Sequence, residues 1–278
     1  MQFRIGTTET YDPSLCIDSW KNTIGEYDFI LYITKVLNPE VISVLTSDEF
    51  MKKMSIIHLT CTGWGGSFLE PNVVAPEVFC DKAKQLIAAG YPAERIVWRV
   101  DPIVPIKDGL ERFKKSVELG LLAGVTSFRS SVLQLYKHSY TRIVDTPIIE
   151  EINQIYKGKF WPDKEAAFDF YMKLRDVVRD FQSRYENKLD FCACASSQLH
   201  QCGFKDLACV SVCDFILNGV DAHELWGHQK GTQRAGCGCL LKHQMIPGGY
   251  SRGRCPNKCL YCYLKDKETE EVESERLF

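Results

Sequence analysis

Six short runs of apolar and β-branched residues recur along the first two-thirds of the chain, and patterns typical of helices separate them. The runs cover residues 2–8, 27–34, 55–62, 95–103, 124–132 and 188–195. Helical patterns occur at 76–90, which begins with Pro and ends with Gly, at 108–120 and at 164–185. Strands that alternate with helices in this way predict an α/β fold with a parallel sheet.

Such a sheet can be open and doubly wound, or it can curve into a barrel. A doubly wound sheet that binds nucleotides carries a glycine-rich phosphate loop after its first strand, and no such loop follows residues 2–8. We therefore expect a partial (β/α)6 TIM-like barrel over residues 1–200, with its chemistry at the carboxyl ends of the strands. A cysteine-rich extension over 201–265 and an acidic tail over 266–278 complete the predicted domains.

Composition places the chain with ordinary globular proteins. Hydrophobic residues make up 45% of its 278 residues and aromatic residues 12%, enough for a large core, which excludes a wholly disordered chain. No stretch approaches the roughly 18 apolar residues of a membrane-spanning helix. The first ten residues lack the basic and apolar segments of a secretory signal. We therefore expect a cytoplasmic protein with no membrane partner.

Charged and polar side chains stand near the ends of the predicted strands. Arg99 and Asp101 are two residues apart, so they lie on the same side of one strand, and Arg129 occupies the next strand. These three are the candidate catalytic residues. Arg99 is also a candidate for binding a cofactor, as is Thr62 at the end of the third strand. The alternative interpretation of the charged residues is a layer of salt bridges that closes the barrel.

Cysteine is frequent in the chain and concentrated towards its C-terminal end. The 13 cysteines are an odd number in a chain without an export signal, so metal or redox chemistry explains them better than disulfides. Three precede residue 190 and ten follow it. Because the region that holds most of them has little apolar periodicity, we expect a metal centre to stabilise it.

Three of these cysteines, Cys255, Cys259 and Cys262, form a C-x3-C-x2-C motif with Tyr261 directly before the third. Three thiolates cannot complete a tetrahedral zinc site without a fourth ligand. On a [4Fe–4S] cluster they leave one iron open, and that vacancy can bind a ligand. The spacing therefore predicts that the extension binds an iron–sulfur cluster with an open iron.

The motif resembles the signature of the radical S-adenosylmethionine (SAM) enzymes. In that superfamily the open iron binds the amino and carboxylate groups of SAM, and the reduced cluster cleaves SAM to a radical that abstracts hydrogen from substrate. The resemblance implies SAM as cofactor and a flavodoxin or ferredoxin as electron donor, and Tyr261 joins Thr62 and Arg99 as a candidate cofactor-binding residue. Rearrangement, isomerisation, bond cleavage and group insertion are all open as the reaction, so an isomerase, a lyase and a transferase remain possible.

Most of the chain also resembles the DUF1848 family. The matching segments are RIVWRVDPI, SFRSSVLQLYKH, RAGCGC and CPNKCLYCY, in that order. This resemblance implies a second set of four cysteines, which are Cys192, Cys209, Cys237 and Cys239.

Four cysteines close a [4Fe–4S] cluster without an open iron, so we expect an auxiliary cluster on the second set and two clusters in all. A structural zinc ion is the alternative, since four thiolates also complete a tetrahedral zinc site. The remaining cysteines of the region are expected to be ordinary thiols beside the site. They are Cys194, Cys202 and Cys213.

The charge of the C-terminal region bears on the substrate. Residues 225–264 hold six Lys and Arg residues and no Asp or Glu, although the whole chain has a net charge of −2. Part of this charge offsets thiolate clusters, and with the interleaved aromatic residues it favours an anionic substrate, a nucleotide or a nucleic acid. An alternative from another class is a nucleic-acid-binding module without catalysis, stabilised by a cluster or by zinc.

Overall fold

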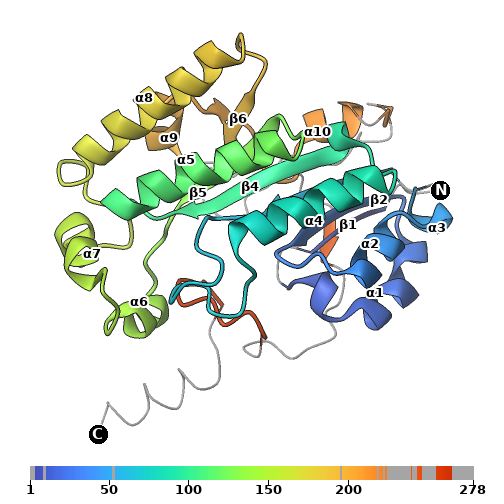
Figure 1. The fold of residues 1–278 in the computed structure, drawn as a ribbon, viewed down its shortest axis with the longest axis horizontal. Helices are drawn as coiled ribbons and strands as arrows, with labels where there is room; N and C mark the ends of the chain where they lie inside the picture. Colours follow the sequence, from blue (N-terminus) through green and yellow to red (C-terminus); the bar gives the residue numbers. More distant parts are fainter. Residues whose placement is uncertain are drawn as a thin grey trace, which may run out of the picture.

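A computed structural model of the chain describes residues 4–8, 11–51, 54–194, 196–217, 219–221, 223, 239, 243–245 and 255–264. Strands and helices alternate along most of this part of the chain (Figure 1). The strands are β1 (Ile5–Thr7), β2 (Phe29–Thr34), β3 (Met54–Thr60), β4 (Ile96–Ile103), β5 (Ser127–Val132), β6 (Asp190–Ala193), β7 (Lys205–Asp206) and β8 (His243–Met245). The α-helices are α1 (Ile17–Thr23), α2 (Pro39–Leu45), α3 (Asp48–Met51), α4 (Pro76–Ala88), α5 (Lys107–Leu122), α6 (Lys137–Ile143), α7 (Ile149–Tyr156), α8 (Phe168–Arg184), α9 (Ser197–Gln201) and α10 (Val212–Leu217).

All the described strands join one sheet in the order β7-β6-β5-β4-β3-β2-β1-β8, and every neighbouring pair is parallel. From β1 to β7, each strand pairs with the one before it in the chain, so this order lacks the switch point of a doubly wound sheet. The predicted α/β class and parallel sheet are confirmed. The two edge strands, β7 and β8, come from the predicted cysteine-rich region.

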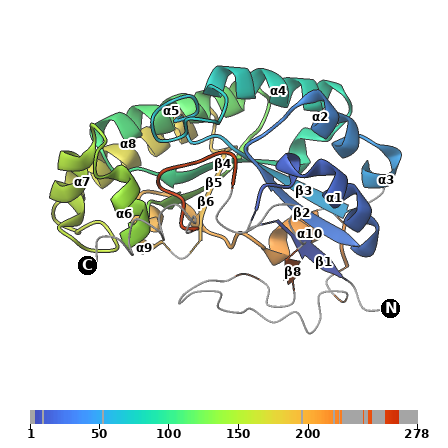
Figure 2. The same cartoon turned by 90° about the horizontal axis from the view of Figure 1, so that it is seen from below.

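Helices α2, α4, α5 and α8 lie along one face of the sheet (Figures 1 and 2). The predicted helices at 76–90, 108–120 and 164–185 correspond to α4, α5 and α8. The apolar stripe of each helix packs on the strands of the sheet. Helix α5 lies close to the sheet at Gly120, where an added Cβ would be 2.8 Å from the Trp98 ring of β4. Trp98 also donates from Nε1 to Ser116 Oγ at 3.0 Å. In the described part of the chain, no helix combines the length and apolarity needed to span a membrane.

The opposite face of the sheet is covered by α10 and the chain that leads into it. Phe215 of α10 packs against Phe29 of β2, with ring centroids 3.9 Å apart. Asp214 accepts from Arg129 of β5 at 2.9 Å, so a buried ion pair also fixes α10 to the sheet. A second apolar cluster therefore forms between α10 and strands β1 to β4, apart from the larger core under the helices.

Residues 255–264 pack against loops at the carboxyl ends of the central strands (Figure 2). The backbone N–H of Leu260 donates to the Leu69 carbonyl at 3.0 Å, and Asn72 Nδ2 donates to the Pro256 carbonyl at 2.7 Å. Arg142 of α6 donates to the carbonyl of Cys262. These bonds hold the C-x3-C-x2-C motif on the loop after β3 and on α6. The predicted acidic tail, 266–278, lies outside the described residues.

Candidate metal and cofactor site

A cavity of about 430 Å³ lies where residues 255–264 meet the carboxyl ends of the strands. Its volume is in the range of small-molecule sites. Polar residues from strand ends line it, among them Thr60, Arg99 and Asp101. Two groups of cysteines also line it: Cys255, Cys259 and Cys262 in the first, and Cys194, Cys209 and Cys239 in the second. One cavity therefore brings together cysteines from four separate parts of the chain.

All three cysteines of the predicted cluster motif line this cavity. Cys259 is buried, whereas Cys255 and Cys262 are partly exposed. Burial raises the pKa of the Cys259 thiol to about 12, although the positive charge of Lys35 lowers it in part. A thiol with so high a pKa stays protonated in the apo protein, so binding of a metal there must release a proton.

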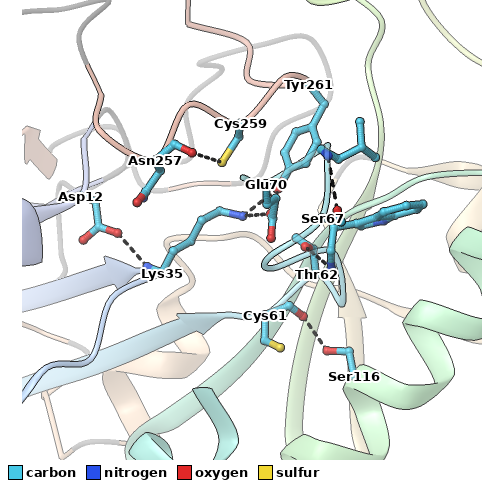
Figure 3. A network of polar contacts seen from close by, with 12 residues as sticks. Asp12, Lys35, Cys61, Thr62, Ser67, Glu70, Ser116, Asn257, Cys259 and Tyr261 are labelled. Atoms are coloured by element: carbon cyan, nitrogen blue, oxygen red, sulfur yellow. Dashed lines mark hydrogen bonds and ion pairs between the residues drawn. The ribbon is translucent and has the colours of Figure 1, made fainter. Parts of the chain in front are cut away.

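A buried network of three side chains fixes the motif to the rest of the site (Figure 3). Lys35, just past β2, donates from Nζ to Tyr261 Oη at 2.7 Å and forms an ion pair with Glu70. Tyr261 in turn donates from its hydroxyl to Glu70. Burial lowers the pKa of Lys35, but the negative charges around it, that of Glu70 foremost, and its hydrogen bond to Glu70 together raise that pKa above its usual value. For Tyr261, burial raises the pKa of the hydroxyl, so the network pairs a lysine cation with a neutral phenol.

Asp12 forms a second buried anchor at the cavity wall. Its carboxylate accepts from the backbone N–H of Lys35 at 2.7 Å, from Thr34 Oγ1 at 2.7 Å and from the backbone N–H of Ser14 at 3.1 Å. Burial raises its pKa, and these hydrogen bonds lower it in part. Asp12 therefore holds the end of β2 in the position from which Lys35 reaches the cysteine motif. Sequence patterns gave no sign of Asp12, Lys35 or Glu70, because each is an isolated charged residue.

The three candidate catalytic residues separate into two environments. Arg99 and Asp101 line the cavity and form an ion pair with each other, and Asp101 also accepts from Ser131. Arg129 is paired in register with Arg99 but is buried, and it does not line the cavity. Its partner is Asp214, whose pKa burial raises to about 6. All three residues are therefore in ion pairs, but only Arg99 and Asp101 line the cavity.

The candidate cofactor-binding residues also differ in position. Tyr261 lines the cavity together with Arg99. Thr62 is buried and does not line it, but its side chain forms a hydrogen bond with Tyr261. Thr62 also accepts from the backbone N–H of Trp64 at 3.2 Å. It therefore lies behind Tyr261, where it can position that side chain.

The second cysteine group differs from the set that the sequence predicts. The sulfur atoms of Cys194, Cys209 and Cys239 all lie within 4.8 Å of one another. Cys192 lies two residues earlier in β6, in register with Arg129, and burial raises its pKa to about 12. The structure thus brings Cys194 into the group and leaves Cys192 beside Arg129. The remaining predicted ligand, Cys237, falls outside the described residues.

The fold and the site together define an α/β protein with a parallel sheet and two cysteine groups at one cavity. The model of the family described as a domain of unknown function, DUF1848, matches residues 6–264. The chain belongs to this family, as its sequence segments predict. No curated protein and no solved structure matches the chain. The family description names no activity, so the function has to be argued from the site.

Proposed function

We propose that the protein is a radical SAM enzyme that holds a [4Fe–4S] cluster on Cys255, Cys259 and Cys262. The observation that carries this proposal is that all three cysteines line one cavity of about 430 Å³. A purely structural metal site has no need of an adjoining space for a ligand. A cluster with an open iron requires one, because SAM must bind beside it.

The residues present fit such a cluster in number and in charge. The motif supplies three thiolates, which leaves one iron without a protein ligand. The Lys35 cation lies close enough to Cys259 to favour its thiolate form, and it offsets part of the negative charge of the site. When bound, the cluster supplies the electron that cleaves a carbon–sulfur bond of SAM.

The chain's own side chains would bind and orient the ligands. Arg99 and Asp101 present opposite charges to the cavity from the end of β4. A guanidinium binds a carboxylate or a phosphate through two parallel hydrogen bonds, and a carboxylate accepts from an amine or a ribose hydroxyl. We assign Tyr261, with Thr62 behind it, to holding the cysteine motif in place against this pair.

The proposed architecture is the partial (β/α)6 barrel expected from the sequence. Consecutive strands that pair in chain order, with helices on one face, are the arrangement of such barrels. The carboxyl ends of the strands carry the chemistry in this class, and the cavity adjoins those ends. Residues 255–264 would then cover the mouth of the barrel.

The substrate remains a proposal from the sequence. We retain an anionic substrate, a nucleotide or a nucleic acid strand, because residues 225–264 are basic and rich in aromatic residues. The reaction would begin with hydrogen abstraction, and a flavodoxin or a ferredoxin would supply electrons. The auxiliary metal, a [4Fe–4S] cluster or a zinc ion, would belong to the second cysteine group, and a cytoplasmic location stays a prediction.

The test is SAM cleavage by protein that is purified and reconstituted without oxygen. With iron, sulfide and dithionite, the wild-type chain should convert SAM to methionine and 5′-deoxyadenosine. Cys259→Ala should abolish this conversion, whereas Cys213→Ala, at an exposed thiol away from the cavity lining, should not. A reconstituted wild-type protein that carries iron and sulfide but never cleaves SAM would support the nucleic-acid-binding module instead.

A further inference from the structure

Cys194, Cys209 and Cys239 come from separate segments and meet at one wall of the cavity. Cys194 directly follows β6, Cys209 precedes α10, and Cys239 precedes β8. Their sulfur atoms all lie within 4.8 Å of one another. The three thiols contact each other by hydrogen bonds, and the backbone N–H of Val210 donates to Cys239. Thiols are weak hydrogen-bond donors and acceptors, so these hydrogen bonds alone contribute little to holding three segments together.

The distances distinguish this group from the C-x3-C-x2-C motif. Among the described residues, no other three Cys, His, Asp or Glu side chains bring ligand atoms within 4.8 Å of one another. The thiols of Cys255, Cys259 and Cys262 are therefore spaced more widely. Tetrahedral zinc, with bonds of about 2.3 Å, places its thiolates about 3.8 Å apart. A [4Fe–4S] cluster attaches each cysteine to a different iron, and its sulfur ligands lie farther apart.

The charges around the group also suit a single divalent ion. Three thiolates around such an ion carry a net charge of about −1. Arg99, whose guanidinium is positively charged, lines the same cavity as the three cysteines. Cys194 and Cys239 are buried, and Cys209 is only partly exposed, which limits access of water to the site. Thiolate ligands in tetrahedral arrangement select zinc over the harder divalent cations magnesium and calcium.

We propose that Cys194, Cys209 and Cys239 bind one zinc ion, with a water molecule from the cavity as its fourth ligand, at a site separate from the C-x3-C-x2-C motif that lines the same cavity. This proposal goes beyond the proposed function and does not depend on it. The ion joins the end of β6, the segment before α10 and the segment before β8. It thereby fixes one part of the cavity lining, while the C-x3-C-x2-C motif forms another part.

The test is the zinc and iron content of anaerobically purified protein, measured by mass spectrometry for the wild-type chain and three variants. Wild type should contain about one zinc ion per chain. In Cys194→Ser the zinc content should fall by about tenfold or more, because a thiolate ligand is lost. Cys192→Ser is the matched control, because Cys192 lies two residues before Cys194, in β6, and this variant should keep its zinc. The triple Ala variant of Cys255, Cys259 and Cys262 should also keep zinc while it loses iron.

A second measurement needs no substitution and so does not depend on how the variants fold. Cadmium-113 exchanged into the wild-type chain should give a resonance in the range of thiolate-rich sites. Absence of zinc, or its loss from Cys192→Ser but not from Cys194→Ser, would overturn the proposal. A second set of iron atoms lost only with Cys194→Ser would overturn it in favour of an auxiliary cluster. None of these results affects SAM cleavage at the other cysteine group, which is measured separately.

Discussion

Arg99 and Arg129 occupy paired positions on neighbouring strands, yet their surroundings give them different roles. Arg99 lines the cavity with a side chain 19% exposed, and its ion-pair partner Asp101 lines it too. Arg129 is buried and donates to Asp214 at 2.9 Å. A guanidinium at a cavity can hold an anionic group with two parallel hydrogen bonds. One that is buried with its partner contributes to stability instead.

The substitution Arg99→Lys should weaken ligand binding without loss of the fold. Lysine keeps the charge but lacks the planar fork, so SAM or substrate should bind about 1–3 kcal/mol more weakly, the scale of a hydrogen bond to a charged group. Arg129→Lys should show the reverse, with the free energy of unfolding reduced by about 1–3 kcal/mol. Isothermal titration with SAM and urea unfolding measure the two effects. If Arg99→Lys bound SAM and turned over substrate as wild type does, Arg99 would not belong to the site.

At the scale of single residues, a sequence pattern can predict a local metal-binding motif more readily than it can predict which distant side chains lie together. The motif at Cys255, Cys259 and Cys262 is recognisable because its spacing is local. The choice between Cys192 and Cys194 is different, since residues two apart in a strand lie on the same face. Only the fold shows that Cys194, just past the end of β6, is the one beside Cys209.

At the scale of elements, the network of Lys35, Glu70 and Tyr261 connects three segments that are distant in sequence. Lys35 follows β2, Glu70 lies in the loop after β3, and Tyr261 belongs to the cysteine motif. The side chain of Glu70 is 1% exposed, so its charge depends on Lys35 for compensation. The network therefore holds residues 255–264 on the sheet.

Lys35→Met should destabilise the protein by about 3–5 kcal/mol, because it leaves the buried Glu70 carboxylate without its cation. The double variant Lys35→Met/Glu70→Leu should recover much of that loss, since an apolar pair can replace a buried ion pair. Urea unfolding monitored by circular dichroism measures both. Lys21→Met is the control, because Lys21 pairs with Glu40 on the surface, and its unfolding should change little.

This prediction fails if the double variant is no more stable than the single one. The stability would then come from the packing of the Lys35 side chain and not from its charge. Iron content of the single variant gives a second readout. It should fall along with stability, because Tyr261 loses one of its two partners in the network.

The longer elements could be predicted from sequence, and the short ones could not. Strands β2 to β5 and helices α4, α5 and α8 have apolar patterns long enough to set their periodicity, and the short strands β1 and β6 lie inside the longer apolar runs 2–8 and 188–195. Strand β7 has two residues and is defined by its pairing with β6, and β8 has three residues and is defined by its pairing with β1. Such short strands carry no pattern of their own, so a sequence places them in a loop region.

At the scale of the whole molecule, the parallel sheet explains why distant cysteines meet. Every strand from β1 to β7 is parallel to its neighbours, so all their carboxyl ends lie at one edge. Cys194 reaches this edge by following β6, and the motif at 255–262 reaches it by packing on the loop after β3. A prediction of parallel strands implies this convergence. The distances within each cysteine group required the structure.

The central claim is that a cluster on Cys255, Cys259 and Cys262 has an open iron that binds SAM in the cavity. Low-temperature electron paramagnetic resonance of the reduced, reconstituted protein tests it most directly. We predict a [4Fe–4S] signal that is lost in the triple Ala variant and whose g values change when SAM is added to the wild-type chain. A wild-type cluster signal that SAM leaves unchanged, or a SAM-responsive signal that survives in the triple variant, would contradict the account.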